Sequence, residues 1–463
     1  MQNQEKYGEE VLLVEPRGIE PVPANERHGR SRNIFTLWFS ANLEFATLSL
    51  GVLSINVFGL SLWQAVASIV IGTVLGALVI GFLTTFGYKW GIPQLIQSRA
   101  SFGFIGNMFP ALFNFIAGIG WYAVNSVLGV YALQYILPIG FLPDLIIMIA
   151  LQAIVSVYGH NLIHFVERIS ALLLAVVFII VTFYAIGHAH FNISDLQAIH
   201  SSNGLSGEFI LSIGVSLSYM MGWMTFSSDY SRYLPEKTSA KRAFNAAFWG
   251  NVIPCVWLEV LGAILATIKP VFSPTDIVTG IMPHWMVIIT MLAIILGTLT
   301  ANVLNIYSGS LSLLAIDARW IRAIAPKRWV AALLVGILGG ILSYFGGQNN
   351  YYSNYSNFLY VLAYWVSPWV AVLLIDYFFF GKGKRSVQEF YEGAKSFRFG
   401  FFAFLIGFLV SIFFFNQQLF TGPIAHAFPG IGDISYYVSF IVAAIVYSIY
   451  AIIRKNRETS LNM

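Results

Sequence analysis

The sequence predicts an all-α integral membrane protein with twelve transmembrane helices, and composition is the first observation behind this prediction. The 463 residues are 57% hydrophobic and 16% aromatic, whereas only 10% are charged, and the mean hydropathy is +0.73. Soluble proteins carry about 25% charged residues, so this chain has too few polar side chains to cover a soluble surface. Disordered, collagen-like and disulfide-rich secreted chains and ordinary cytosolic enzymes are therefore excluded.

The second observation is the recurrence of apolar segments close to the ~20 residues that a spanning helix needs. A solvated N-terminal tail, residues 1–33, is expected before them, and residues 454–463 form a C-terminal tail. The polar segment 348–357 is expected to be an external loop. The transporter domain then covers 34–453, with spans expected at about 34–57, 62–86, 104–134, 142–159, 164–187, 208–228, 244–267, 283–314, 329–347, 357–380, 399–416 and 434–453.

The third observation is the distribution of positive charge over the loops between these spans. With twelve spans, 24 of the 25 Lys and Arg residues fall on the side of the N-terminus, and Lys269 alone falls on the other. Cytoplasmic loops carry the excess of Lys and Arg, so both termini are expected in the cytoplasm, in a plasma membrane protein. The polar N-terminal tail has no apolar core of the kind a signal peptide requires.

Several kinds of chemistry lack a sequence signal. The chain has no G-x-x-x-x-G-K-[ST] phosphate loop, and its single cysteine, Cys255, cannot form an internal disulfide. The eight histidines are scattered, without the clustered spacing of a metal site. No convergent acid–base set favours an enzyme, and no filter motif or ring of charge favours a channel. We expect no cofactor, no nucleic acid and no obligate protein partner; the bilayer and a small molecule are the expected partners.

Polar residues at bilayer depth are costly and mark candidate functional sites. The first span carries Asn42 and Glu44 near its midpoint. A carboxylate there must be protonated, paired, or facing water or a cation. Glu44 is therefore a candidate proton, cation or substrate site, and the alternative is a structural acid neutralised by a neighbouring helix.

Two other spans combine aromatic rings with side-chain amides. Trp121 and Asn125 in the third span are four residues apart, so they share one helix face. A flat indole can stack on a planar heterocycle, and an amide offers a donor and an acceptor to its edge. Trp223 in the sixth span is a second candidate aromatic plate. A lipid-facing tryptophan is the alternative for each ring.

The eighth span carries a polar stripe that begins with Thr298 and Thr300 and continues with Asn302 and Asn305. Buried amides need hydrogen-bond partners. The stripe is a candidate substrate site, and hydrogen bonding between neighbouring helices is the alternative.

These residues sit in motifs through which the chain resembles the nucleobase–cation symporter family, most closely its purine–cytosine permease branch, which is related to the cytosine permeases and hydantoin transporters. The resemblance runs through nearly the whole membrane region. The motifs are Asn25-Glu26-Arg27-His28-Gly29, Leu37-Trp38-Phe39-Ser40-Ala41-Asn42, Gly91-Ile92-Pro93-Gln94, Ser98-Arg99-Ala100-Ser101-Phe102-Gly103, Gly120-Trp121 with Asn125, Ser228-Asp229-Tyr230-Ser231-Arg232-Tyr233-Leu234-Pro235, Ala301-Asn302, Asn305-Ile306-Tyr307-Ser308, and Asn357-Phe358-Leu359 with Tyr364-Trp365.

The resemblance implies a LeuT-like fold of two inverted five-helix repeats, about 34–187 and 208–380, plus two extra helices in 399–453. Helices one and six would be unwound near the midplane, where the substrate binds. It also implies that Trp121 and Asn125 are the plate and amide of helix three. Trp223 would be the plate of helix six, with the register around Tyr219–Trp223 left open, and Asn302 and Asn305 would be the amides of helix eight.

The implied function is import of a nucleobase, cytosine or a purine, by cation symport with alternating access. Sodium-coupled members place backbone carbonyls of helix one and two hydroxyls of helix eight around the ion. The aligned pair here is Thr300 and Ala301, so one hydroxyl is missing. We therefore expect proton coupling through Glu44, with Asn42 and Thr300 beside it and sodium as the alternative. A related heterocycle such as allantoin, a hydantoin, or a vitamin pyrimidine or pyridine is the alternative substrate.

Overall fold

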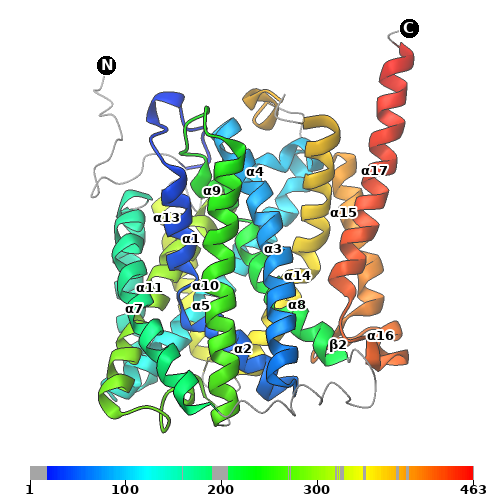
Figure 1. Cartoon of the computed structure of the whole chain (residues 1–463). Coiled ribbons are helices and arrows are strands. Elements are labelled where there is room, and N and C mark those ends of the chain that lie inside the picture. Colours follow the sequence, from blue (N-terminus) through cyan, green and yellow to red (C-terminus); the bar gives the residue numbers. More distant parts are fainter. Residues whose placement is uncertain are drawn as a thin grey trace.

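The computed structural model is a bundle of helices that run between two ends of the molecule (Figure 1). It describes residues 18–158, 160–189, 207–269, 271, 273–316, 318, 321, 323, 328–347, 351–381, 385–392 and 396–461, without the side chains of 154–158, 160–169, 171, 328 and 457–461. The expected tail residues 1–17, most of the expected loop between the fifth and sixth spans, and residues 462–463 lie outside this part of the chain.

Long helices make up almost all of the described structure. Seven of them are long and apolar enough to cross a membrane, and an eighth crossing is possible if the bent pair near the N-terminus counts as one. The helices that build the bundle are α1 (Ser31–Ala41), α2 (Phe45–Val52), α3 (Leu62–Trp90), α5 (Arg99–Ile136), α6 (Phe141–Tyr158), α7 (His160–His188), α8 (Gly207–Met224), α9 (Ser227–Ser231), α10 (Ala240–Ile268), α11 (His284–Ala315), α13 (Arg328–Gly346), α14 (Tyr351–Asp376), α15 (Phe399–Ser411) and α17 (Ser435–Leu461).

Short elements connect and cap these helices. A two-stranded antiparallel hairpin, β1 (Asn416–Gln417) with β2 (Phe420–Thr421), lies between α15 and α17. The remaining elements are α4 (Gln94–Gln97), α16 (Pro423–Ala427), π-helical turns at Leu53–Val57 and Tyr377–Gly381, and 3-10 turns at Ala24–Glu26, Pro274–Ile277, Val387–Phe390, Ile412–Phe414 and Pro429–Ile431.

Every predicted span contains a helix, but the expected external loop 348–357 is wrong. α14 begins at Tyr351, so the part of that segment which the structure describes is helical. Although this segment is polar in composition, three of its tyrosines, Tyr351, Tyr352 and Tyr355, are buried in the structure. Tyr351 and Tyr355 are four residues apart, which is helical spacing.

The expected solvated tail is also wrong for residues 18–30. Val22 is fully buried, and its backbone N–H donates to the carbonyl of Gly91 over 2.8 Å. Arg27 donates to the carbonyls of Val22 and Tyr88 and forms a 3.1 Å ion pair with Glu236. This segment therefore packs against the loops that follow α3 and α9. It lies at the same end of the bundle as the C-terminal end of α17 (Figure 1).

In the described part of the chain, the first and the sixth predicted spans are interrupted. The first breaks at Asn42, Leu43 and Glu44, where α1 and α2 meet at 56°. Glu44 has extended backbone, with φ −135° and ψ 166°. The sixth predicted span is helical through Gly222 and breaks only at Thr225 and Phe226, between α8 and α9. These interruptions bring backbone carbonyls into the interior of the bundle.

Close backbone contact fixes α2 against α10. A Cβ atom at Gly51 would lie 1.7 Å from the carbonyl oxygen of Glu259, and one at Gly262 would lie 1.9 Å from that of Leu48. Neither position can therefore carry a side chain without moving a helix backbone, and the glycines hold the segment after the first break against α10.

We predict that Gly51→Ala destabilises the folded protein by about 1–3 kcal/mol or more, the usual cost of overpacking a tight interface. Gly336→Ala is the matched control, because among the described residues nothing lies within 4 Å of a Cβ placed there. Thermal melting of the two purified variants measures the difference. Equal melting temperatures would contradict the packing of α2 on α10.

Candidate functional site

Asn42, at the end of α1, is the first element of the candidate site. Its Nδ2 donates to the carbonyl of Trp38 over 2.7 Å and to Oδ1 of Asn251 over 3.0 Å. Its Oδ1 accepts a 2.9 Å hydrogen bond from Nε1 of Trp223. The fully buried amide therefore joins the break in the first helix to α10 and α8.

Glu44, two residues further on, is also buried and is held by α8. Its Oε1 accepts a 3.0 Å hydrogen bond from the hydroxyl of Tyr219. The same hydroxyl lies 2.7 Å from Oγ1 of Thr47, which donates to the carbonyl of Asn42 over 2.9 Å. Tyr219 thus contacts Glu44 and Thr47 on the α2 side of the break, and Thr47 in turn bonds the carbonyl of Asn42 on the α1 side.

Trp121 of α5 is surrounded by aromatic rings from two other helices. Its ring centroid lies 5.4 Å from that of Tyr219 and 5.2 Å from that of Phe358, with interplanar angles of 85° and 88°. Gly222 lets α8 approach, since a Cβ atom there would lie 2.7 Å from Nε1 of Trp121. The predicted plate is therefore an interior residue, 5% exposed, and not a lipid-facing tryptophan.

Trp223, the predicted plate of the sixth span, has different neighbours. Its ring lies 5.4 Å from that of Trp38 and 6.4 Å from that of Tyr219. Tyr219 therefore lies between the two tryptophans and is edge-on to both, at 85° in each case. The sequence pattern alone gives Tyr219 no assigned role, although its spacing of four residues from Trp223 places both on one face of α8.

The amides on α5 and α11, two helices that pack against each other, differ in how they are satisfied. Asn302 donates to the carbonyl of Tyr122 and to Oγ of Ser126, each over 3.0 Å. Asn305 donates to Oδ1 of Asn302 over 3.2 Å. Within the described part of the chain, Oδ1 of Asn305 and both amide atoms of Asn125 are buried without a hydrogen-bond partner.

Unsatisfied buried polar atoms are rare and call for an explanation, because each costs about 1–3 kcal/mol. The two side chains are each 1% exposed. Together, Asn125 and Asn305 offer one NH₂ group and two carbonyl oxygens. That set matches the edge of a small ring that carries its own donors and acceptors.

Thr300, the predicted coupling residue of the eighth span, is buried and donates to the carbonyl of Gly297 over 2.8 Å. Gly297 in turn faces the break in the first helix, since a Cβ atom there would lie 3.1 Å from the carbonyl oxygen of Leu43. α11 therefore passes the break one turn before Thr300. Among the described residues, no group of three or more His, Cys, Asp or Glu side chains could hold a metal ion.

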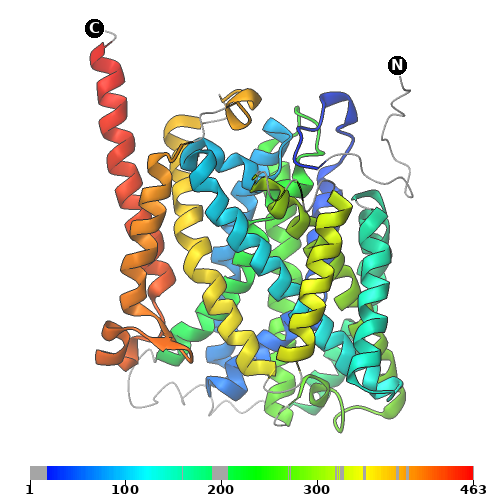
Figure 2. The same cartoon turned by 180° about the vertical axis from the view of Figure 1, so that it is seen from behind.

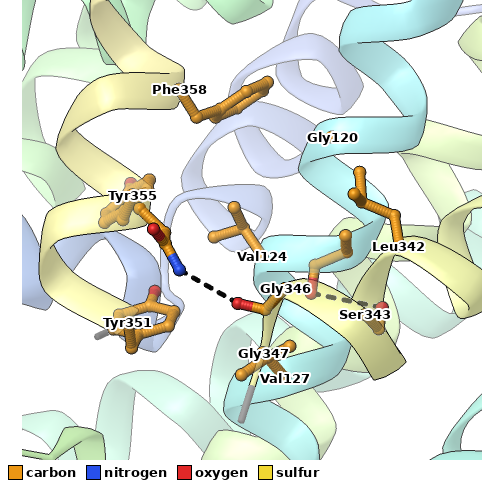
Figure 3. Close-up of a pocket in the computed structure, with 12 residues that line it drawn as sticks. Gly120, Val124, Val127, Leu342, Ser343, Gly346, Gly347, Tyr351, Tyr355 and Phe358 are labelled. Atoms are coloured by element: carbon orange, nitrogen blue, oxygen red, sulfur yellow. Dashed lines mark hydrogen bonds between the residues drawn. The ribbon is translucent and has the colours of Figure 1, made fainter. Parts of the chain in front are cut away.

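A cavity of about 280 Å³ lies between α5, α13 and α14. In Figure 3, Tyr351, Tyr355 and Phe358 of α14 face it, and residues of α5 and α13 line the opposite side. Phe358 both lines the cavity and contacts the ring of Trp121. The cavity therefore reaches the aromatic cluster from the end of the bundle where α13 ends and α14 begins.

Comparison with known proteins identifies the family of this chain. Residues 21–439 match the family described as permeases for cytosine/purines, uracil, thiamine and allantoin. The putative purine-cytosine permease YxlA of Bacillus subtilis is 30% identical, over 94% of this chain and 95% of the relative. The purine-cytosine permease fcyB of Emericella nidulans is 28% identical, over 94% and 88% respectively.

The fold has a counterpart among solved structures. Mhp1, a nucleobase-cation-symport-1 family transporter in a closed conformation with bromovinylhydantoin bound, superposes with a TM-score of 0.77 at 16% identity, covering 95% of each chain. This likeness establishes the fold as that of a multi-pass membrane transporter. With the family match over most of its length, the chain belongs to the family of permeases for cytosine and purines, uracil, thiamine and allantoin.

Proposed function

We propose that this protein is a secondary transporter that imports a nucleobase, cytosine or a purine, by cation symport with alternating access. The observation that carries the proposal is the pair of unsatisfied amides, Asn125 on the same helix as Trp121 and Asn305 on α11, which packs against that helix. A nucleobase has a flat face for an indole and an edge of ring nitrogens, carbonyl and amino groups for amides. Tyr219 and Trp223 supply further aromatic surface at the same level of the bundle.

We also propose the finer architecture: twelve crossings, with inverted repeats at about 34–187 and 208–380, extra helices in 399–453 and both termini in the cytoplasm. The packing supports it, since α3 contacts α10 and α5 contacts α11. These are the second and third helices of each proposed repeat. Their first helices are the broken ones, α1–α2 and α8–α9.

For the coupling ion we propose a proton carried by Glu44, with sodium as the alternative. Glu44 lies at the break and accepts a hydrogen bond from Tyr219 of α8. Protonation of Glu44 can therefore shift the equilibrium between two positions of α8 relative to the first helix. Asn42 lies at the break and joins it to Asn251, and Thr300 lies one turn along α11 from Gly297, which faces the break.

A related heterocycle such as allantoin or a vitamin is the second candidate substrate, because the description of the matching family also names thiamine and allantoin. The same rings and amides could bind these molecules. A channel or a membrane-embedded enzyme is the candidate of a different class, and it would give no saturable accumulation driven by a gradient.

Uptake of radiolabelled cytosine into proteoliposomes under an imposed proton gradient, competed by a panel of nucleobases, allantoin and thiamine, tests the function. We expect saturable uptake that cytosine or a purine suppresses at the lowest concentration. Trp121→Ala should abolish this uptake, because the stacking surface is lost, while the protein remains monodisperse in detergent. Uptake at the wild-type level in Trp121→Ala would contradict the site. Suppression by allantoin or thiamine alone would instead favour the second candidate.

Asn305→Ala should weaken substrate binding by about tenfold, because a polar atom of the substrate edge would be left without its partner, at a cost of about 1–3 kcal/mol. Direct binding to purified protein, measured by isothermal titration, reports the change. Ser310→Ala is the control on the same helix, since Ser310 donates only to its own helix, at the carbonyl of Tyr307. An unchanged affinity in Asn305→Ala would remove Asn305 from the site.

Glu44→Gln should reduce proton-driven uptake at least tenfold and remove its dependence on external pH, because the amide cannot release a proton. Equilibrium binding of the substrate should change much less. Wild-type uptake should persist when sodium is replaced by choline at constant pH. Strict dependence of wild-type uptake on sodium would contradict proton coupling through Glu44.

A further inference from the structure

A second cavity, distinct from the candidate substrate site, lies at the end of the bundle that carries the described N-terminal residues. Its volume is about 730 Å³, and it is bounded by the last residues of the helix pair α14 and Tyr377–Gly381, by the segment before α15 and by α17. Tyr391, close to this segment in the chain, donates to the carbonyl of Ile19, so both belong to one end of the molecule. We predict that this end faces the cytoplasm.

Three arginines line this cavity together with a single carboxylate, Glu389. Arg385 donates twice to Asp376 through Nη2, over 2.8 and 2.9 Å. Its Nε atom is buried and, among the residues described, lacks a hydrogen-bond partner. Arg398 donates to the carbonyl of Ala100 over 2.7 Å.

The third arginine, Arg454 of α17, closes the other side of the cavity. Its guanidinium lies over the ring of Phe380, 5.2 Å from the centroid. Arg385 and Arg398 come from the connection between α14 and α15, and Arg454 comes from α17, so two parts of the chain meet at this cavity. Converging guanidinium groups are the arrangement that binds the oxygens of a phosphate.

The surroundings of the cavity favour a lipid over a soluble anion. The aromatic side chains that line it, including Phe397 and Tyr450, are of the type that lies at a membrane interface. Next to it, Phe378 and Phe402 are 46% and 45% exposed, and Ile453 is 50% exposed. Phe402 belongs to α15 and Ile453 to α17, which form one edge of the bundle (Figures 1 and 2), so these two apolar side chains lie on that outer edge.

We infer that the cavity formed by Arg385, Arg398 and Arg454 binds the phosphate headgroup of an anionic phospholipid, whose acyl chains lie along the exposed apolar surface of α15 and α17. Basic pockets between helices on the cytoplasmic side suit such headgroups. Because Arg454 belongs to α17 and the other two arginines belong to the connection between α14 and α15, the headgroup clamps α17 to that connection. This site is independent of the transported substrate.

The melting temperature of the detergent-purified full chain, titrated with dioctanoyl phosphatidylglycerol, tests the inference. We expect a saturable rise. Dioctanoyl phosphatidylcholine, and inorganic phosphate at matched ionic strength, should give none. A rise of equal size with phosphatidylcholine would overturn the headgroup site, and one with inorganic phosphate alone would overturn its assignment to a lipid.

Two variants with opposite expected effects locate the site. Arg454→Gln should raise the apparent Kd for phosphatidylglycerol about fivefold, the loss typical of one basic contact near a membrane. Lys455→Gln is the control, because Lys455 is an exposed cation on the same helix that does not line the cavity. Glu389→Gln removes the lining carboxylate and should lower the Kd.

Each variant can overturn the inference separately. An unchanged Kd in Arg454→Gln, or an equal loss in Lys455→Gln, would show that phosphatidylglycerol acts elsewhere. If Arg454→Gln does not purify as a monodisperse protein, the Kd of Glu389→Gln for phosphatidylglycerol tests the site instead. A Kd that stays the same or rises in Glu389→Gln would also overturn the site.

Discussion

The break in the first helix at Asn42, Leu43 and Glu44 is the constraint on which the rest of the interior depends. In a bilayer every backbone polar group must find a partner inside the protein, and a break releases several of them at once. The carbonyl of Trp38 accepts a hydrogen bond from the side-chain amide of Asn42, and the carbonyl of Asn42 accepts one from the hydroxyl of Thr47. The break therefore persists only with these side chains in place.

The neighbouring helices must then approach closely enough to complete the network. α8 contributes Tyr219 to Glu44 and Trp223 to Asn42, and α10 contributes Asn251. These contacts set the position of α8. At Gly222, which has no side chain, α8 packs directly against the indole of Trp121 from α5. The aromatic cluster beside the candidate substrate site is thus a consequence of how the break is satisfied.

The sequence could supply the parts of this arrangement but not their pairing. Hydropathy located helices correctly, since every predicted span contains one, because the bilayer requires a minimum apolar length. Asn42 and Glu44 were identifiable because polar residues at depth are rare. Tyr219 gave no such signal, since tyrosine is common in this chain and its hydrogen bond to Glu44 joins residues 175 positions apart. Likewise, the polar composition of 348–357 concealed the start of α14, whose buried face is made of tyrosines.

The two asparagines of α11 show why a polar stripe alone does not define a site. Asn302 and Asn305 are three residues apart, yet Asn302 gives its donors to α5 whereas Asn305 keeps a carbonyl oxygen without a partner among the described residues. An amide whose hydrogen bonds are all made holds two helices together. An amide atom buried without a partner has already lost its hydrating water during folding, so a ligand does not have to desolvate it again. A substrate that supplies the missing donor recovers about 1–3 kcal/mol at that atom. On the proposed function, binding energy would concentrate at Asn125 and Asn305, whereas Asn302 holds α11 to α5 through Tyr122 and Ser126.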